Sequence, residues 1–127
     1  MTPELYRIHV PPTAAGVRPV LLVGSNNYRR RVSIMYRRWI IQVGGVDTIA
    51  ELFVYTKDSV SAAFSAPGIQ IPAGMQFQVE LDREDRLWAI ADANASLNPE
   101  NGIDVSVVVE TLDVDDRAAE PPERKAV

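Results

Sequence analysis

The sequence predicts an all-β fold, a β-sandwich or a jelly-roll-like barrel of seven or eight short antiparallel strands. Three runs of residues carry this prediction. Across residues 75–82, apolar and polar side chains alternate without a break, which is typical of a strand with one buried and one solvent-facing side. Residues 87–91 are apolar on both faces, and residues 103–112 again alternate valines with polar residues. Turn-forming residues separate these runs, and the sequence contains no internal repeat.

The composition is that of one globular domain. The chain has 127 residues, of which 46% are hydrophobic and 24% charged, and these values are ordinary for a folded domain. Cysteine is absent from the sequence, so we expect neither disulfides nor a cysteine-based zinc site. The first residues lack the basic start and apolar run of a signal peptide, and no apolar run approaches the roughly 18 residues of a membrane span. We therefore expect a protein that is neither membrane-inserted nor secreted through a signal peptide.

The N-terminal part contains four predicted strands, three of which are followed by residues that interrupt a sheet. Prolines end the first, and glycines end the second and the fourth. In the third, Val32, Ile34 and Tyr36 share one face. The four strands are residues 5–10, 19–23, 31–36 and 39–43, the last broken by Gly44-Gly45.

The central part of the sequence predicts several strands, two of which form a hairpin. Residues 48–57 contain a possible capping box, Thr48 with Glu51, but their aromatic and β-branched residues favour a strand over a helix. Residues 58–66 read as a loop and residues 71–74 as a tight turn. The charged segment 82–86 then predicts a hairpin that joins strand 75–82 to strand 87–91.

The C-terminal part is predicted to be a loop over 96–102, a strand over 103–112 and a flexible acidic, proline-containing tail over 113–127. We therefore divide the chain into residues 1–27, which belong to the same domain, a sandwich core over 28–112, and the tail.

Charge is distributed unevenly along the sequence. Up to Gly45 there are seven arginines and one acidic residue, a net charge of +6, whereas the remainder has six basic and sixteen acidic residues, a net charge of −10. Such asymmetry can create opposed patches that guide docking. Alternatively, the two halves pair as neighbouring strands and their charges interleave.

Candidate catalytic or metal-binding groups are sparse. His9 is the only histidine, and nothing in the sequence marks a nucleophile to accompany it. Glu80, Asp82, Glu84 and Asp85 could gather around a hard cation, but their spacing matches no calcium loop and favours a solvated loop. The sequence thus predicts a protein without enzymatic activity, cofactor or metal.

The arginines are the best candidates for a binding surface. Residues 29–31 and 37–38 are all arginine, with Tyr28, Tyr36 and Trp39 nearby to stack on bases. Because the whole chain is acidic, with a net charge of −4, nucleic-acid binding is the weaker alternative. Guanidinium groups also pair well with carboxylates, so we expect a protein partner.

Five segments follow one another along residues 28–112. They are Arg30-Arg31-Val32-Ser33-Ile34, Leu52-Phe53-Val54-Tyr55, Gly68-Ile69-Gln70-Ile71-Pro72-Ala73-Gly74, Leu87-Trp88-Ala89-Ile90-Ala91 and residues 105–110. Their order resembles a small β-domain of tailed-phage virion proteins. In that family an Arg-Arg pair opens a strand, an apolar-Pro-x-Gly turn precedes a polar-faced strand, and a Leu-Trp/Tyr-Ala-Ile-Ala strand leads to a valine-rich last strand. The sequence departs from the family over residues 36–49, where the family has a short polar turn, so this extension is itself a candidate partner-binding feature.

The resemblance implies a non-enzymatic virion component, assembled in the host cytoplasm. It would be a capsid decoration or cement protein, or a head or tail accessory protein. Its partners would be copies of itself, for example in a trimer, and the major capsid protein or other virion proteins. The predicted contact residues are Arg29, Arg30, Arg31, Arg37, Arg38, Asp82, Arg83, Glu84, Asp85 and Arg86.

The competing class is a ligand-binding β-sandwich, such as a carbohydrate-binding or adhesion module. Trp39, Trp88 and the tyrosines could form a platform for sugar rings if they are exposed. Because Trp88 lies in a strand that is apolar on both faces, we expect it to be mostly buried.

Overall fold

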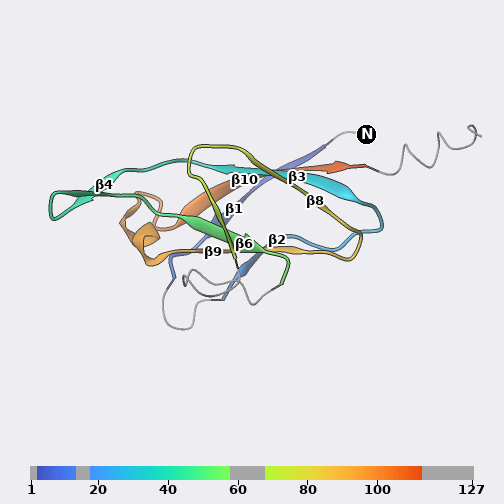
Figure 1. Ribbon diagram of the computed structural model, residues 1–127, viewed down its shortest axis with the longest axis horizontal. Coiled ribbons are helices and arrows are strands. Elements are labelled where there is room, and N and C mark those ends of the chain that lie inside the picture. The colour runs from blue at the N-terminus through green and yellow to red at the C-terminus, as the bar shows by residue number, and fades with distance from the viewer. Residues whose placement is uncertain (1–2, 14–17, 58–67, 113–127) are drawn as a thin grey trace, which may run out of the picture.

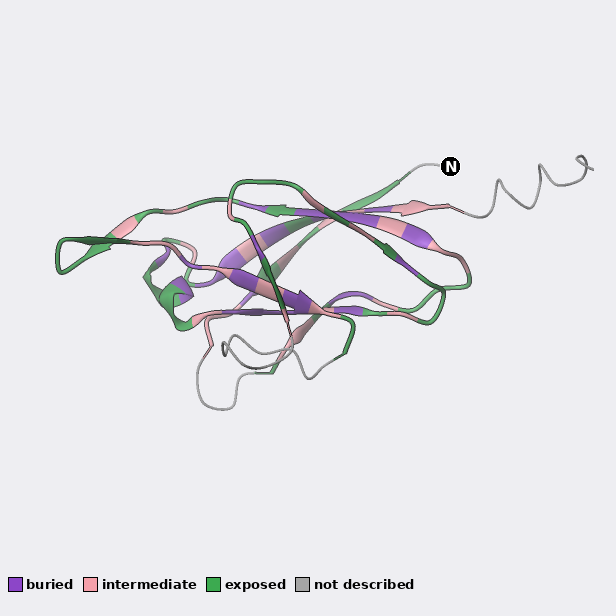
Figure 2. Ribbon diagram, in the orientation of Figure 1, coloured by how far each residue is buried: buried purple, intermediate pink, exposed green. Residues whose placement is uncertain are grey.

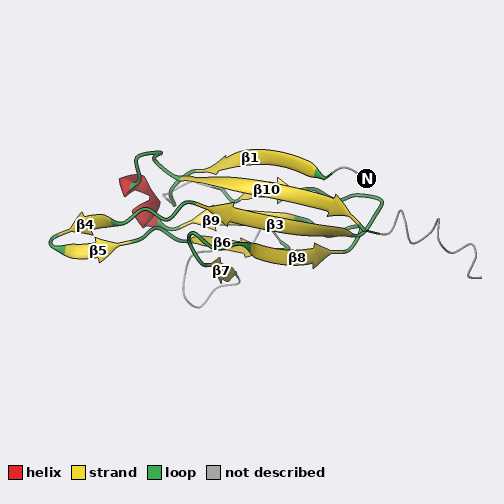
Figure 3. Cartoon of the chain, turned by 90° about the horizontal axis from the view of Figure 1, so that it is seen from above, coloured by secondary structure: helices red, strands yellow, loops and turns green. Residues whose placement is uncertain are grey.

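The computed structural model describes residues 3–13, 18–57 and 68–112, and in them two four-stranded sheets face each other as a sandwich (Figure 1). The first sheet, sheet A, has the order β1 (Glu4–Val10), β10 (Ile103–Thr111), β3 (Arg30–Tyr36) and β8 (Phe77–Leu81), which Figure 3 shows from above. The second, sheet B, has the order β2 (Val20–Val23), β9 (Leu87–Ala91), β6 (Leu52–Tyr55) and β7 (Ile69–Ile71). All these pairs are antiparallel. The all-β sandwich prediction is confirmed, and neither sheet closes into a barrel.

Two smaller features extend the sandwich at one end. Strands β4 (Ile41–Val43) and β5 (Val46–Thr48) pair only with each other and project as a two-stranded hairpin (Figures 1 and 3). A short 3-10 helix, η1 (Ala93–Leu97), follows β9. The predicted loop over 96–102 therefore begins inside this helix.

The core lies between the two sheets. In sheet A the alternating residues Val32, Ile34 and Tyr36 of β3 point inward, as predicted, and the alternating valines of β10 do the same. In sheet B the inward residues include Leu52 and Val54 of β6. Figure 2 shows the resulting pattern, with burial concentrated along the central strands and exposure along the projecting hairpin. Burial of this apolar surface is the main stabilising term of the fold.

Two tyrosine hydroxyls join the sheets across the core. The Tyr6 hydroxyl donates a hydrogen bond to the Leu22 carbonyl at 2.6 Å. The Tyr36 hydroxyl donates to the Ile71 carbonyl and accepts a hydrogen bond from the Leu52 amide at 3.1 Å. Burial raises the pKa of Tyr36 to about 12, so the hydroxyl remains protonated and can donate.

The predicted hairpin between strands 75–82 and 87–91 is wrong. Strand β8 pairs with β3 in sheet A, whereas β9 pairs with β2 and β6 in sheet B, so the loop between β8 and β9 crosses from one sheet to the other. The alternation along each strand was read correctly, but it specifies which face is buried and not which strand is the neighbour. The turn before β8 also crosses between sheets, since β7 belongs to sheet B.

The remaining expectations are refined by the structure. Residues 48–57 contain strand and no helix; they comprise the end of β5 and the whole of β6. The strand expected over 39–43 is limited to Ile41–Val43. The loop expected over 58–66 and the tail expected over 113–127 lie outside the described residues. Strands β1 and β2 are full members of the two sheets, which places residues 4–10 and 20–23 in the sandwich itself.

Candidate functional site

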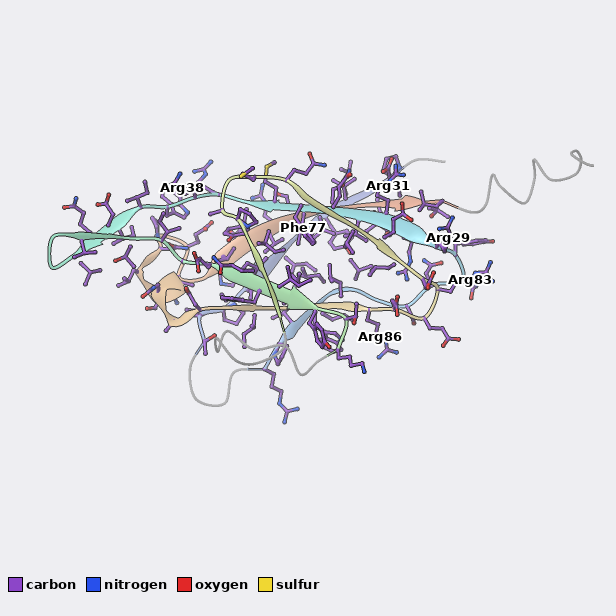
Figure 4. All side chains as sticks on the ribbon, viewed as in Figure 1. Arg29, Arg31, Arg38, Phe77, Arg83 and Arg86 are labelled. Atoms are coloured by element: carbon purple, nitrogen blue, oxygen red, sulfur yellow. The ribbon has the colours of Figure 1, made fainter. Side chains whose placement is uncertain are left out.

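The structure divides the predicted contact residues between two ends of the molecule. Arg29, Arg31 and the loop 82–86 lie where β3 begins and β8 ends, whereas Arg37 and Arg38 follow the last residue of β3. Figure 4 shows Arg29, Arg83 and Arg86 at one end and Arg38 at the other. Strand β3 has seven residues, and at about 3.4 Å per residue it separates the two groups by roughly 24 Å. The stretch 29–38 is therefore not one surface.

Arg30 is a structural residue and not a contact residue. Its side chain is 1% exposed and points into the sandwich on the same face of β3 as Val32. The guanidinium donates to the carbonyl of Gly24, to that of Asp82 at 2.7 Å and to that of Asp85 at 3.1 Å, while Nε donates to the Tyr28 carbonyl at 3.1 Å. Burial lowers the pKa of Arg30, and the nearby Asp85 opposes that shift. The side chain joins the loop before β3 to the loop after β8, and its burial removes it from the predicted contact surface.

The alternation of β3 contained the signal for this placement. Arg30 is two residues before Val32, so a period of two places it on the buried face, whereas Arg29 and Arg31 fall on the other. The sequence prediction grouped Arg29, Arg30 and Arg31 as one contact cluster. Consecutive residues of a strand point to opposite faces, so the three side chains do not share one surface.

The exposed charges at this end interleave across neighbouring strands. Arg31 lies 3.9 Å from Glu80 of β8 and 3.8 Å from Glu110 of β10, and Arg29 lies 3.5 Å from Glu80. The register places Arg31 directly between the two glutamates. Such exposed pairs each contribute little to stability. They nevertheless show that, here, the basic and acidic halves of the sequence neutralise each other.

The loop 82–86 is compact. The Asp85 amide donates to the Asp82 carbonyl at 3.1 Å, and the Asp85 carboxylate accepts a hydrogen bond from the Asp82 amide at 3.2 Å. Arg83, Glu84 and Arg86 are exposed along this loop. The structure thus brings this loop together with Arg29 and Arg31 at one end of sheet A.

A second group of arginines surrounds a shallow hollow at the other end of sheet A. We call it the arginine hollow; its volume is about 530 Å³. Arg7 comes from β1, while Arg37 and Arg38 come from the segment between β3 and β4. The lining also includes Met35, Glu100 and Asp104.

The two carboxylates of the arginine hollow have partners other than its arginines. Asp104 Oδ1 lies 2.6 Å from His9 Nδ1, and Glu100 Oε1 accepts a hydrogen bond from the Trp39 indole at 3.0 Å. The Arg37 guanidinium is 5.1 Å from the centroid of the Trp39 ring, a cation–π contact that holds it in place without neutralising it. Hydrogen bonding to His9, helped by Glu100 and Arg7, lowers the pKa of Asp104, so this carboxylate is ionised at neutral pH.

His9 lies in β1, and its imidazole ring faces two oxygen atoms from the C-terminal part of the chain. Nδ1 faces Asp104, and Nε2 lies 3.2 Å from the Asn101 carbonyl oxygen. Both ring nitrogens are thus directed at oxygen atoms of the chain itself. Sequence reasoning missed the His9–Asp104 pair because its residues are 95 positions apart.

The hairpin β4–β5, which we call the arm, exposes several apolar side chains. Val43 is 48% exposed and Val46 64%, and Ile40, the residue directly before β4, is 51% exposed. Gly44 and Gly45 form its turn, with φ of 58° and 81°, a left-handed pair that suits a tight two-residue hairpin. The sequence signal was present, because two glycines between apolar runs predict a hairpin, but it was read as the end of a strand.

The outer face of sheet A is a further uncovered surface. It is formed by the residues that alternate with the core residues along each strand. These outward residues include small polar, apolar and charged side chains. Leu5 and Met35 are exposed on it, and Met75 is exposed in the turn that leads into β8. This face meets the arginine hollow at Met35 and Ser106.

The described residues contain no group of three or more histidine, aspartate or glutamate side chains that could hold a metal ion. Nor does any helix among them have the length and apolar character needed to cross a bilayer. No protein-family model, no curated protein and no solved structure matches this chain. The fold and its surfaces define an antiparallel β-sandwich with a projecting arm.

Proposed function

We propose that this protein is a non-enzymatic structural component of a tailed-phage virion, most simply a capsid decoration or cement protein that stabilises the particle through contacts between subunits. The order of segments that resembles small virion β-domains supports the virion assignment. The observation that carries the structural role is the arm, because a two-stranded hairpin with exposed Ile40, Val43 and Val46 is poorly suited to water.

The surfaces available to partners suit assembly better than chemistry. The arm, the outer face of sheet A and the loop 82–86 are open and shallow, and in the part of the chain that the structure describes no acid, base and nucleophile converge. A subunit that binds only assembled neighbours stabilises that assembly by mass action. Binding of the arm to a neighbouring subunit would also remove its apolar side chains from water.

The test compares particles assembled with and without this chain. We expect imaging of the particles to locate the protein on their surface, and particles that lack it to lose their contents at lower temperature. A Val43→Ser, Val46→Ser variant should bind such particles at least tenfold more weakly. A matched Asp47→Asn variant on the same hairpin keeps an oxygen atom that can accept the hydrogen bond from Gln42, and it should bind like the wild type. Absence of the protein from particles, or wild-type binding by the valine variant, would contradict the proposal.

A ligand-binding sandwich is the second candidate, and one observation favours it. Trp88 of β9 lies opposite Tyr55 of β6 on the outer face of sheet B, next to the exposed Leu21, and both rings are half-buried instead of fully buried. Such a pair offers an apolar face to a sugar ring. Saturable quenching of tryptophan fluorescence by a glycan, abolished by Trp88→Ala, would favour this function over the structural one.

A further inference from the structure

The three arginines of the arginine hollow have no ion-pair partner among the residues that the structure describes. The ion pairs of this region join His9 to Asp104, and those of the opposite end involve Arg29 and Arg31. Arg37 rests on the Trp39 ring, and Arg38 packs beside Gly74. The hollow therefore presents positive charge that its own carboxylates do not neutralise through direct contact.

The chain also contains an acidic segment of matching charge. Directly after the last described residue, Leu112, the sequence reads Asp113-Val114-Asp115-Asp116, three carboxylates within four residues. Guanidinium groups pair with carboxylates in a planar, often two-pronged geometry, so three arginines around one hollow suit a short acidic segment.

Distance decides whether the segment can reach the arginine hollow of its own chain. Tyr36, the last residue of β3, lies opposite Val105 of β10, and Arg37 and Arg38 continue beyond it. Val105 is seven residues before Leu112, so at about 3.4 Å per residue the two arginines lie roughly 27 to 30 Å from the start of the segment. Four residues span at most about 14 Å. A fully extended segment 113–116 thus ends roughly 13 Å short of the Cα atom of Arg37 in the same molecule, and farther from that of Arg38.

We propose that the acidic segment 113–116 of a second copy of this chain binds in the arginine hollow, with its carboxylates paired to Arg37, Arg38 and Arg7. The inference rests on the proposed structural function and adds the contact that joins neighbouring copies. Because Leu112, to which the segment is attached, lies at the opposite end of sheet A from the hollow, the contact joins unlike ends of two molecules. A contact of this head-to-tail kind closes into a ring when its rotation allows.

The test measures self-association of the full-length protein by sedimentation, with variants matched in each partner. Two variants should each weaken self-association at least tenfold. The first is a triple variant of the segment that combines Asp113→Asn, Asp115→Asn and Asp116→Asn. The second is a double variant of the hollow that combines Arg37→Gln and Arg38→Gln. The matched control for the segment is a double variant that combines Glu120→Gln with Glu123→Gln, further along the sequence. The matched control for the hollow is Arg18→Gln. Both controls should associate like the wild type. Association should also weaken as salt rises from about 0.05 to 0.5 M, because ions screen the charges.

A charge-reversal experiment distinguishes a contact between copies from one within a chain. One double variant carries Arg37→Glu with Arg38→Glu, and a second carries Asp115→Arg with Asp116→Arg. Each of these two proteins should associate poorly alone. Mixed together they should associate again, because the reversed hollow of one now fits the reversed segment of the other. Failure of the mixture to recover, or wild-type association of the segment variant, would overturn this inference.

The outcomes also separate this inference from the proposed function. If the segment variant still binds particles and associates normally, the acidic contact is wrong while the structural role stands. If the wild-type protein is a monomer that binds no particle, both are wrong. Binding of a short single-stranded DNA that needs Arg37 and Arg38, with no effect of the segment variant on association, would assign the hollow to nucleic acid instead.

Discussion

Arg30 shows how one side chain can hold two loops. Its guanidinium donates to main-chain carbonyls from the segment before β3 and from the loop after β8. Buried carbonyl groups without a donor are costly, and a guanidinium supplies several donors from one fixed plane. The loop that carries the predicted contact residues Arg83, Glu84 and Arg86 therefore depends on a residue that no partner can touch.

We expect Arg30→Leu to lower the free energy of unfolding by about 3 kcal/mol, because the carbonyls that it satisfies would lose their donor. Urea unfolding measures this difference. The neighbouring Arg31→Ala should cost only about 0.5 kcal/mol, since the ion pairs of Arg31 are exposed. Equal losses for the two variants would show that the buried hydrogen bonds do not stabilise the loops.

The His9–Asp104 pair predicts a specific acid dependence of stability. The hydrogen bond from His9 lowers the pKa of Asp104 below its ordinary value of 3.8, so folding favours the ionised carboxylate. The stabilisation is present above that ordinary value and is lost as pH falls through the lowered pKa of the folded state. The difference in unfolding free energy between the wild type and Asp104→Asn should therefore shrink between about pH 5 and pH 2.

Urea unfolding across this range checks the acid dependence, with Ser106→Ala as the control. Ser106 is the next outward residue of β10 and does not titrate, so its variant should keep the pH dependence of the wild type. A difference between wild type and Asp104→Asn that stays constant down to pH 2 would contradict the role of the pair.

At the scale of elements, the arm depends on its two glycines. Both have positive φ, a conformation that costs a residue with a Cβ atom about 1 to 2 kcal/mol. We expect Gly44→Ala to destabilise the arm by about 1 kcal/mol without affecting the sandwich. Amide hydrogen exchange should thus become faster in β4 and β5 and stay unchanged in β3 and β10.

Gly24→Ala is the matched control for the arm. A Cβ atom at Gly24 would meet its nearest neighbour, Leu21 Cδ2, at 4.0 Å, an ordinary contact, and Gly24 does not have a positive φ. This variant should leave exchange in the arm unchanged. Faster exchange throughout both sheets in Gly44→Ala would show instead that the arm is an integral part of the folding unit.

Individual elements were more predictable from the sequence than their arrangement. Alternation along β3, β8 and β10 is a local property, so their buried faces could be assigned from nearby residues alone. The pairing of β8 with β3 and of β9 with β6 depends on residues far apart, and the apparent hairpin 75–91 was therefore misread. The arginine hollow was missed for the same reason, since Arg7 and Asp104 meet Arg37 only through the strand order of sheet A.

At the scale of the whole molecule, the chain alternates between the two sheets. Of the connections between successive sandwich strands, only that from β6 to β7 stays within one sheet. The strands of each sheet are separated in the sequence by strands of the other sheet, and both sheets pack on one continuous core. The two sheets should therefore fold as one cooperative unit.

The two tryptophans allow this cooperativity to be measured. Trp88 lies in sheet B, and Trp39 contacts Glu100 beyond one end of sheet A. The variants Trp39→Phe and Trp88→Phe each leave one tryptophan, and their fluorescence should follow the same urea transition as the circular dichroism of the same variant. Separate midpoints for fluorescence and circular dichroism within one variant would indicate that the sheets unfold independently.

The position of the arm between two sandwich strands has a practical consequence. The arm lies in the connection between β3 and β6 and pairs with no described strand of the sandwich. Its turn is open, because a Cβ atom added at Gly44 or Gly45 would have no other atom within 4 Å. A peptide tag inserted between these glycines should thus be tolerated, as insertions at exposed loop tips usually are. Such a tagged protein would retain its fold while carrying foreign sequence at its most distant tip.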